Sequence, residues 1–171
     1  MIREVIIAGF VAACGFFGII KAGQLKERTV LLEDYRRMLL QLKSRINYFR
    51  EPIISILEYE GERGHSRAFI LLSETGTALK EKNAEIGRIW SHNVNEIYKN
   101  TSLTEDDMEI IRYPGNFLGQ TDCDNQQAGF IYMEEKLAAQ IDEAEKICRV
   151  KGPLYRRLGF FAGGLAAIIL I

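Results

Sequence analysis

Long apolar runs occupy both ends of the chain, and they constrain its fold more than any other feature. The segment from Val5 to Ile20 reads VIIAGFVAACGFFGII, and the segment from Leu158 to Ile171 reads LGFFAGGLAAIILI; neither contains a charged residue. Each run is shorter than the roughly 20 apolar residues that cross a hydrocarbon core. Each is nevertheless flanked on its inner side by long cationic side chains, which can reach the surface of a bilayer. We therefore predict transmembrane helices over residues 1–24 and 154–171, and a soluble domain over residues 25–153.

The basic residues beside these runs predict the orientation in the membrane. They are Lys21, Lys26, Arg28, Lys151, Arg156 and Arg157. Because lysine and arginine accumulate on cytoplasmic flanks, we expect an integral membrane protein whose soluble domain is cytoplasmic. One alternative stays open: Val11-Ala12-Ala13-Cys14 is similar to a lipoprotein cleavage site, and processing at Cys14 would invert this topology.

Composition argues against several kinds of function. Cys14, Cys123 and Cys148 lack metal-ligand spacing, so we predict neither a zinc site nor a disulfide framework. The net charge of -1 argues against a nucleic-acid partner, which would require a basic face. The sequence has no GxxxxGK[ST] phosphate loop and no GxSxG elbow. We therefore predict no catalytic residues, no metal and no cofactor.

Between the two runs, apolar residues recur at helical spacing. One stripe predicts a helix over residues 25–49, closed by Glu51-Pro52; its members are Leu32, Tyr35, Leu39, Leu42, Ile46 and Phe49. Further helices are predicted up to Glu60, around Ala68–Leu79, over Ile86–Ile97, from a capping box of Thr104 and Asp107 to Pro114-Gly115, and from Phe130 to Gly152-Pro153. The predicted fold is all-α: an antiparallel bundle of about six helices, flanked by an N-terminal and a C-terminal transmembrane helix.

The segment LGQTDCDNQ, from Leu118 to Gln126, leads into the last soluble helix. Gly119 permits a turn that a Cβ would resist, and Thr121 or Asp122 can cap the helix. Asp122 and Asp124 also favour the positive end of the helix dipole. The alternative is that these two aspartates hold a metal, in a small membrane-tethered, metal-dependent phosphate-binding protein or enzyme.

The order of motifs along the chain resembles the stage III sporulation protein AB family over essentially its whole length. The matching motifs are Leu25-x-Glu27-Arg28, Ile46-Asn47-Tyr48, Leu118-Gly119-x-Thr121-Asp122-x-x-x-Gln126 and Leu154-Tyr155-x-x-Leu158-Gly159. A weaker similarity extends to the cytoplasmic helical domains of type II secretion and type IV pilus platform proteins. The chain departs from the family at Thr29, where relatives usually have proline, so the bend after the first apolar run is expected to be softer.

The resemblance implies a non-enzymatic platform in the channel complex that links the mother cell to the forespore. It places the protein in the outer forespore membrane, with the soluble domain on the mother-cell side. The implied partners are a secretion-type ATPase and other channel components, and self-association stays open. Leu118, Gly119, Thr121, Asp122 and Gln126 are the residues of the most specific motif, and we treat them as the candidate structural or interaction site.

Overall fold

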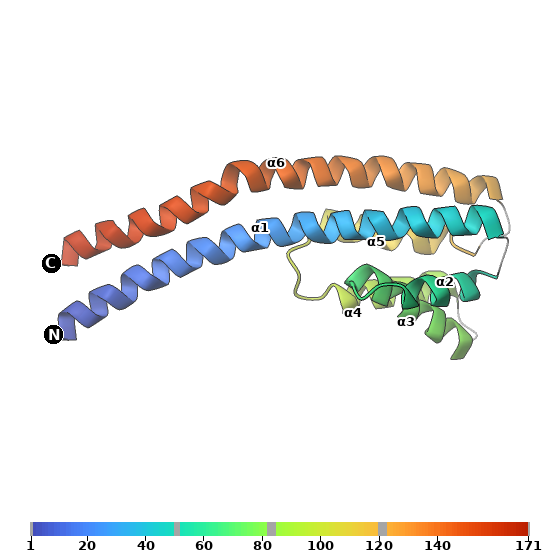
Figure 1. Cartoon of the computed structure of the whole chain (residues 1–171), viewed down its shortest axis with the longest axis horizontal. Helices are drawn as coiled ribbons and strands as arrows, with labels where there is room; N and C mark the ends of the chain where they lie inside the picture. Colours follow the sequence, from blue (N-terminus) through green and yellow to red (C-terminus); the bar gives the residue numbers. More distant parts are fainter. Residues whose placement is uncertain (1, 50–51, 82–84, 120–122, 171) are drawn as a thin grey trace. The chain divides into compact units, whose positions relative to one another are not determined.

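Helices make up most of the described part of the chain (Figure 1). A computed structural model describes residues 2–49, 52–81, 85–119 and 123–170. The elements are α1 (Ile2–Phe49), α2 (Ile53–Glu62), α3 (Arg67–Glu81), α4 (Ile86–Ile97), α5 (Glu105–Arg112), the 3₁₀ helix η1 (Tyr113–Asn116) and α6 (Cys123–Leu170). These residues include no strand, so the predicted all-α bundle of about six helices is confirmed. Over the same residues, no helix combines the length and the hydropathy needed to cross a bilayer.

The chain forms two compact units. The terminal unit consists of Met1–Thr29 and Asp142–Ile171, and the central unit consists of Val30–Ile141. Helices α1 and α6 each contribute to both units, whereas α2 to α5 belong to the central unit alone.

The expected end of the last helix at Gly152-Pro153 is wrong, because α6 continues through Pro153 to Leu170. Proline usually stops a helix because it lacks an N–H and because its ring crowds the Cβ of the preceding residue. Here the preceding residue is Gly152, which has no Cβ, so this part of the crowding is absent. The apolar residues that follow then continue the same helix.

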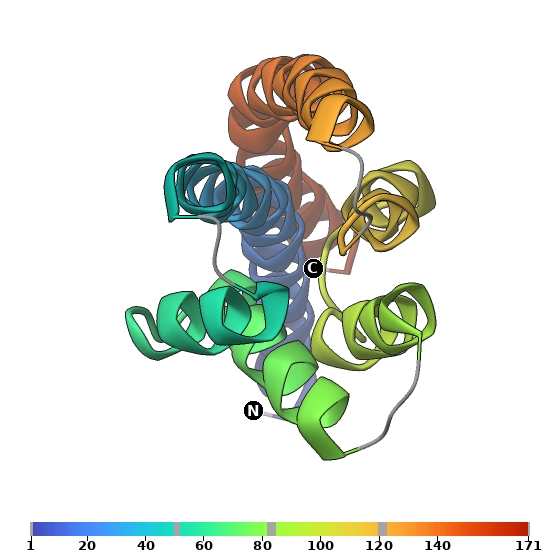
Figure 2. The ribbon, with the colours of Figure 1, turned by 90° about the vertical axis from the view of Figure 1, so that its right-hand side faces the viewer.

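The core of the central unit contains side chains from every helix. Figures 1 and 2 show the central part of α1 between α6 and α2. The predicted stripe on α1 is buried at Leu32, Tyr35, Leu39 and Leu42, while Ile46 is partly exposed. The other helices contribute Ile56, Leu57, Ala68, Leu71, Leu72, Trp90, Val94, Ile111, Phe130, Met133 and Leu137. This shared apolar core stabilises short helices that would be marginal in isolation.

In the terminal unit, α1 and α6 run antiparallel and approach closely at glycines. A Cβ on Gly159 would lie 2.8 Å from the Cys14 carbonyl oxygen, and a Cβ on Gly18 would overlap the Tyr155 carbonyl oxygen. Arg28 is buried and lies 3.8 Å from Glu143 across the same helix pair. Only small residues permit such a short separation between helix backbones.

Candidate functional site

The corner that the sequence singled out begins with a buried residue and a left-handed turn. Leu118 is almost fully buried, and Gly119 has φ +80°, so the predicted turn at this glycine is confirmed. A Cβ on Gly119 would lie 3.6 Å from Ile86, which is an ordinary contact. Glycine is therefore required here by its backbone conformation and not by lack of space.

The remaining residues of the motif are only partly described. Thr121 and Asp122 lie outside the described residues, so the helix cap and the Asp122–Asp124 metal site both stay predictions. Gln126 is partly exposed in the first turns of α6. The structure therefore places Leu118, Gly119 and Gln126 around the start of α6, but it does not assemble a binding site from them.

Aromatic packing fixes this corner against α6. The ring of Phe117 meets Phe130 edge-on at 5.1 Å between centroids, and Tyr113 lies 4.9 Å from Tyr132. A Cβ on Gly129 would lie 2.7 Å from the Phe117 ring, so this ring occupies the space above a glycine. The sequence interpretation missed this cluster, although the Gly129-Phe130 pair was its visible signal.

One carbonyl group joins three helices in the core of the central unit. The Ile111 carbonyl oxygen accepts a hydrogen bond from the Tyr35 hydroxyl at 3.1 Å and another from Trp90 Nε1 at 2.9 Å. Ile111 lies in the last turn of α5, where backbone carbonyls have no partner within the helix. The two side chains, from α1 and α4, therefore satisfy a buried acceptor that α5 alone cannot.

Burial changes the acidity of two tyrosines in this core. It raises the pKa of the Tyr35 hydroxyl well above its ordinary value, and the neighbouring Tyr98 adds to this effect. Burial also raises the pKa of Tyr98, with a further contribution from the Asp34 carboxylate that Arg67 partly opposes. The Tyr98 hydroxyl is buried without a hydrogen-bond partner among the described residues.

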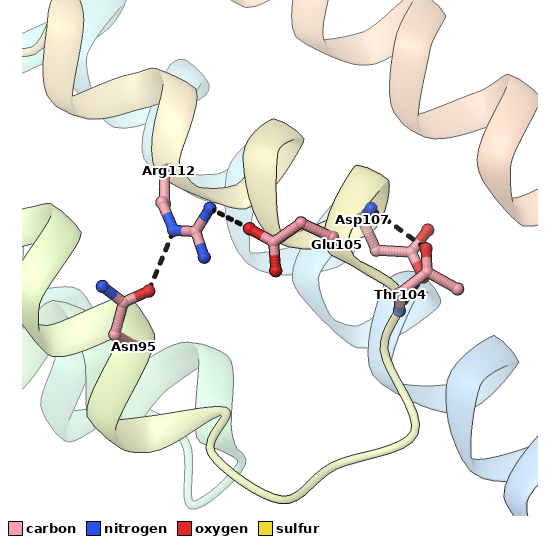
Figure 3. Close-up of polar contacts among 5 residues, drawn as sticks. All are labelled: Asn95, Thr104, Glu105, Asp107 and Arg112. Carbon is pink, nitrogen blue, oxygen red and sulfur yellow. Dashed lines mark hydrogen bonds and ion pairs between the residues drawn. The ribbon is translucent and has the colours of Figure 1, made fainter.

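Helix α5 begins with the predicted capping box, which is confirmed (Figure 3). The Thr104 hydroxyl accepts from the Asp107 N–H at 3.3 Å, and the Asp107 carboxylate accepts from the Thr104 N–H at 2.8 Å. Further along α5, Arg112 donates to Glu105 at 2.7 Å and to Asn95 of α4 at 2.9 Å. The capping box closes the first turn of α5, and Arg112 joins its last turn to α4.

A polar pocket of about 350 Å³ lies between α1 and α2, and we call it the α1–α2 pocket. Its lining includes Glu60, only 2% exposed, whose Oε1 lies 3.6 Å from Arg45 and 3.5 Å from Arg63. The Arg45 guanidinium stacks on the Tyr59 ring at 3.7 Å. Leu40 is exposed at the rim. Arginine and tyrosine are enriched in protein interfaces. No residue spacing in the sequence predicted this pocket.

The six predicted flanking cations do not share one environment. Lys21, Lys26, Lys151, Arg156 and Arg157 are exposed, whereas Arg28 is buried beside Glu143. His65 and His92 are both exposed. In the described part of the chain, no three His, Cys, Asp or Glu side chains lie together as metal ligands would.

The fold and these clusters define an all-α bundle protein in which polar side chains mainly join one helix to another. The sequence matches the model of the stage III sporulation protein AB family over residues 5–171, and the chain therefore belongs to this family. This confirms the resemblance and makes the chain a sporulation protein. A solved structure described as stage III sporulation protein AB (SpoIIIAB) shares the fold. It has a TM-score of 0.65 and 20% sequence identity, over 71% of this chain and 96% of that chain. The comparison with curated proteins gives no match.

Proposed function

We propose that this protein is a non-enzymatic membrane platform of the sporulation channel complex that links the mother cell to the forespore. Its apolar ends lie in the outer forespore membrane, and its central unit faces the mother-cell cytoplasm. There it docks a secretion-type ATPase and contacts other channel components. Family membership is the observation that carries this proposal.

The terminal unit supports the membrane part of the proposal. Large apolar side chains are exposed along it, including Phe16 at 65%, Phe17 at 63% and Phe161 at 69%. Water-soluble proteins rarely expose a contiguous apolar patch of this kind, whereas a bilayer would cover it. The close approach at Gly18 and Gly159 is also typical of paired membrane helices.

A labelling experiment tests the orientation. Cys148 is partly exposed in α6, and it can be the only thiol in a variant with Cys14→Ser and Cys123→Ser. A membrane-impermeant maleimide should label Cys148 only after the mother-cell membrane is permeabilised. Labelling in intact cells would refute the cytoplasmic position, and the mass of the mature amino terminus would reveal processing at Cys14.

The α1–α2 pocket supports the docking part of the proposal. Leu40, Tyr59 and Arg63 are all exposed beside it, and Arg63 is 57% exposed in its side chain. Aromatic and arginine side chains around a pocket are the usual anchors of a protein interface. Arg63 is accessible enough to reach a partner, whereas Arg45, whose side chain is only 16% exposed, is not.

Binding of the purified ATPase to the full chain in membranes tests this surface. Arg63→Ala should weaken binding about thirtyfold, which corresponds to about 2 kcal/mol for an anchor residue. Arg37→Ala is the matched control, because Arg37 is an exposed arginine whose one ion pair among the described residues is with nearby Asp34. Equal losses in the two variants would refute the pocket as the docking surface. Absence of ATPase binding by the unmodified chain would refute the docking role itself.

A further inference from the structure

An apolar cleft lies between α1 and α6 in the terminal unit, and we call it the terminal cleft. It has a volume of about 410 Å³ and is lined by Cys14, Phe17, Gly18, Tyr155, Leu158 and Gly159. Gly18 and Gly159 allow the backbones of the two helices to approach closely, and because they have no side chains, they leave space beside the contact. Phe17 and Leu158, both more than half exposed, border the cleft. The result is an open, almost entirely apolar groove of a size that receives small ligands.

Two lysines lie at one end of the terminal cleft. Lys21 follows Phe17 by one helical turn, and Lys151 precedes Tyr155 by one turn, so each shares the face of the lining residues. Because α1 and α6 are antiparallel, both lysines belong to the same end. The Lys21 ammonium lies 5.7 Å from the centre of the Phe17 ring, which places it beside the cleft. Both lysines are exposed, and neither forms an ion pair with an acidic residue among the described residues.

We propose that the terminal cleft binds an anionic phospholipid, with one acyl chain in the groove and the phosphate between Lys21 and Lys151. An apolar groove that ends in two lysines matches a ligand with a hydrocarbon tail and a negative head. Basic pockets between helices at the cytoplasmic side of a membrane recognise acidic head groups for this reason. A zwitterionic lipid fits less well, because it adds a positive group beside the lysines. This inference depends on the membrane location proposed above.

Photolabelling of the full chain in vesicles tests the proposal. Phosphatidylcholine vesicles receive a trace of either phosphatidylglycerol or phosphatidylcholine that carries a diazirine near the end of one acyl chain. The phosphatidylglycerol probe should label the cleft residues at least about fivefold more than the phosphatidylcholine probe. Lys21→Gln and Lys151→Gln should each reduce this labelling about fivefold. Ala13→Phe, which adds a ring to the cleft lining, should also reduce it without changing any charge.

Arg149→Gln is the matched charge control. Arg149 is an exposed cation two residues before Lys151, which turns it about 200° around α6 and away from the cleft. It should leave labelling of the cleft unchanged. An equal loss in Arg149→Gln and Lys151→Gln, or labels spread evenly along both helices, would overturn the lipid site.

The same vesicles separate the two proposals. If the chain floats with the vesicles but is labelled equally by both probes, the membrane location is supported and the lipid site is refuted. If the chain does not float with any vesicle, both the membrane location and the lipid site are refuted.

Discussion

Removing the hydroxyl group from each of two buried tyrosines in the central unit should change the stability of the protein in opposite directions. Tyr35→Phe and Tyr98→Phe each remove one oxygen atom from a buried side chain. The Tyr35 hydroxyl donates to the Ile111 carbonyl at 3.1 Å, whereas the Tyr98 hydroxyl has no hydrogen-bond partner among the described residues. The pair therefore compares a satisfied buried hydroxyl with an unsatisfied one in a single core.

The size of each change in the free energy of unfolding follows from the hydrogen bonds that remain in the variant. In Tyr35→Phe, the Ile111 carbonyl keeps the bond from Trp90, so the loss should be about 0.5–1.5 kcal/mol in the free energy of unfolding. Tyr98→Phe removes a hydroxyl whose burial without a partner costs about 1–3 kcal/mol. Its stability should therefore be unchanged or higher than that of the unmodified chain.

Fluorescence can follow unfolding, because Trp90 is the chain's single tryptophan and lies in the same core. Urea or thermal unfolding of the full chain in mild detergent gives the change in stability of each variant relative to the unmodified chain. A loss of 1 kcal/mol should lower the midpoint temperature by roughly 4 °C in a domain of this size. If Tyr98→Phe proved more destabilising than Tyr35→Phe, the hydrogen-bond assignment in this core would be refuted.

Three further predictions concern other parts of the chain. Thr104→Ala removes one half of the capping box and should cost about 0.5–2 kcal/mol in thermal unfolding; an unchanged midpoint would contradict the cap's role. Gly18→Ala should destabilise the terminal unit through the clash with the Tyr155 carbonyl, whereas Gly23→Ala, which meets nothing within 4 Å, should stabilise α1 by about 0.5–1 kcal/mol. Similar midpoints for the two glycine variants would refute the close helix contact. Burial raises the pKa of both core tyrosines, so their contribution to stability should be constant below about pH 10 and then fall by about 1.4 kcal/mol per pH unit for each tyrosine. The sign follows because Tyr35 and Tyr98 ionise in that range in the unfolded chain but stay protonated in the folded one. Urea midpoints between about pH 9 and 12 should show a smaller slope in Tyr98→Phe, and an identical slope would contradict this assignment.

Local signals in the sequence were sufficient for most of the helices. The stripe from Leu32 to Leu42 predicted the buried face of α1, and Thr104 with Asp107 predicted the start of α5. Gly119 predicted a turn that its positive φ confirms. Each of these features depends on residues within a few positions of one another, which is the range over which spacing and capping are informative.

Features that join distant segments were not predictable in the same way. Pro153 is a helix breaker by local rules, but Gly152 and the apolar run after it allow α6 to continue. The Tyr35 and Trp90 bonds to Ile111 link residues 76 and 21 positions apart. The α1–α2 pocket likewise needs a carboxylate from α2 and an arginine from α1. No spacing rule within one helix encodes such contacts.

The carbonyl group of Ile111, which two side chains share, should suppress local unfolding of α5. An isolated helix of eight residues would unravel readily, since helices shorter than about 12–15 residues are marginal in water. Because α5 supplies a carbonyl that side chains of α1 and α4 both use, separating it from the core would break two buried bonds at once. Its amide protons should therefore exchange with solvent only when the whole central unit unfolds, as in a single cooperative folding unit.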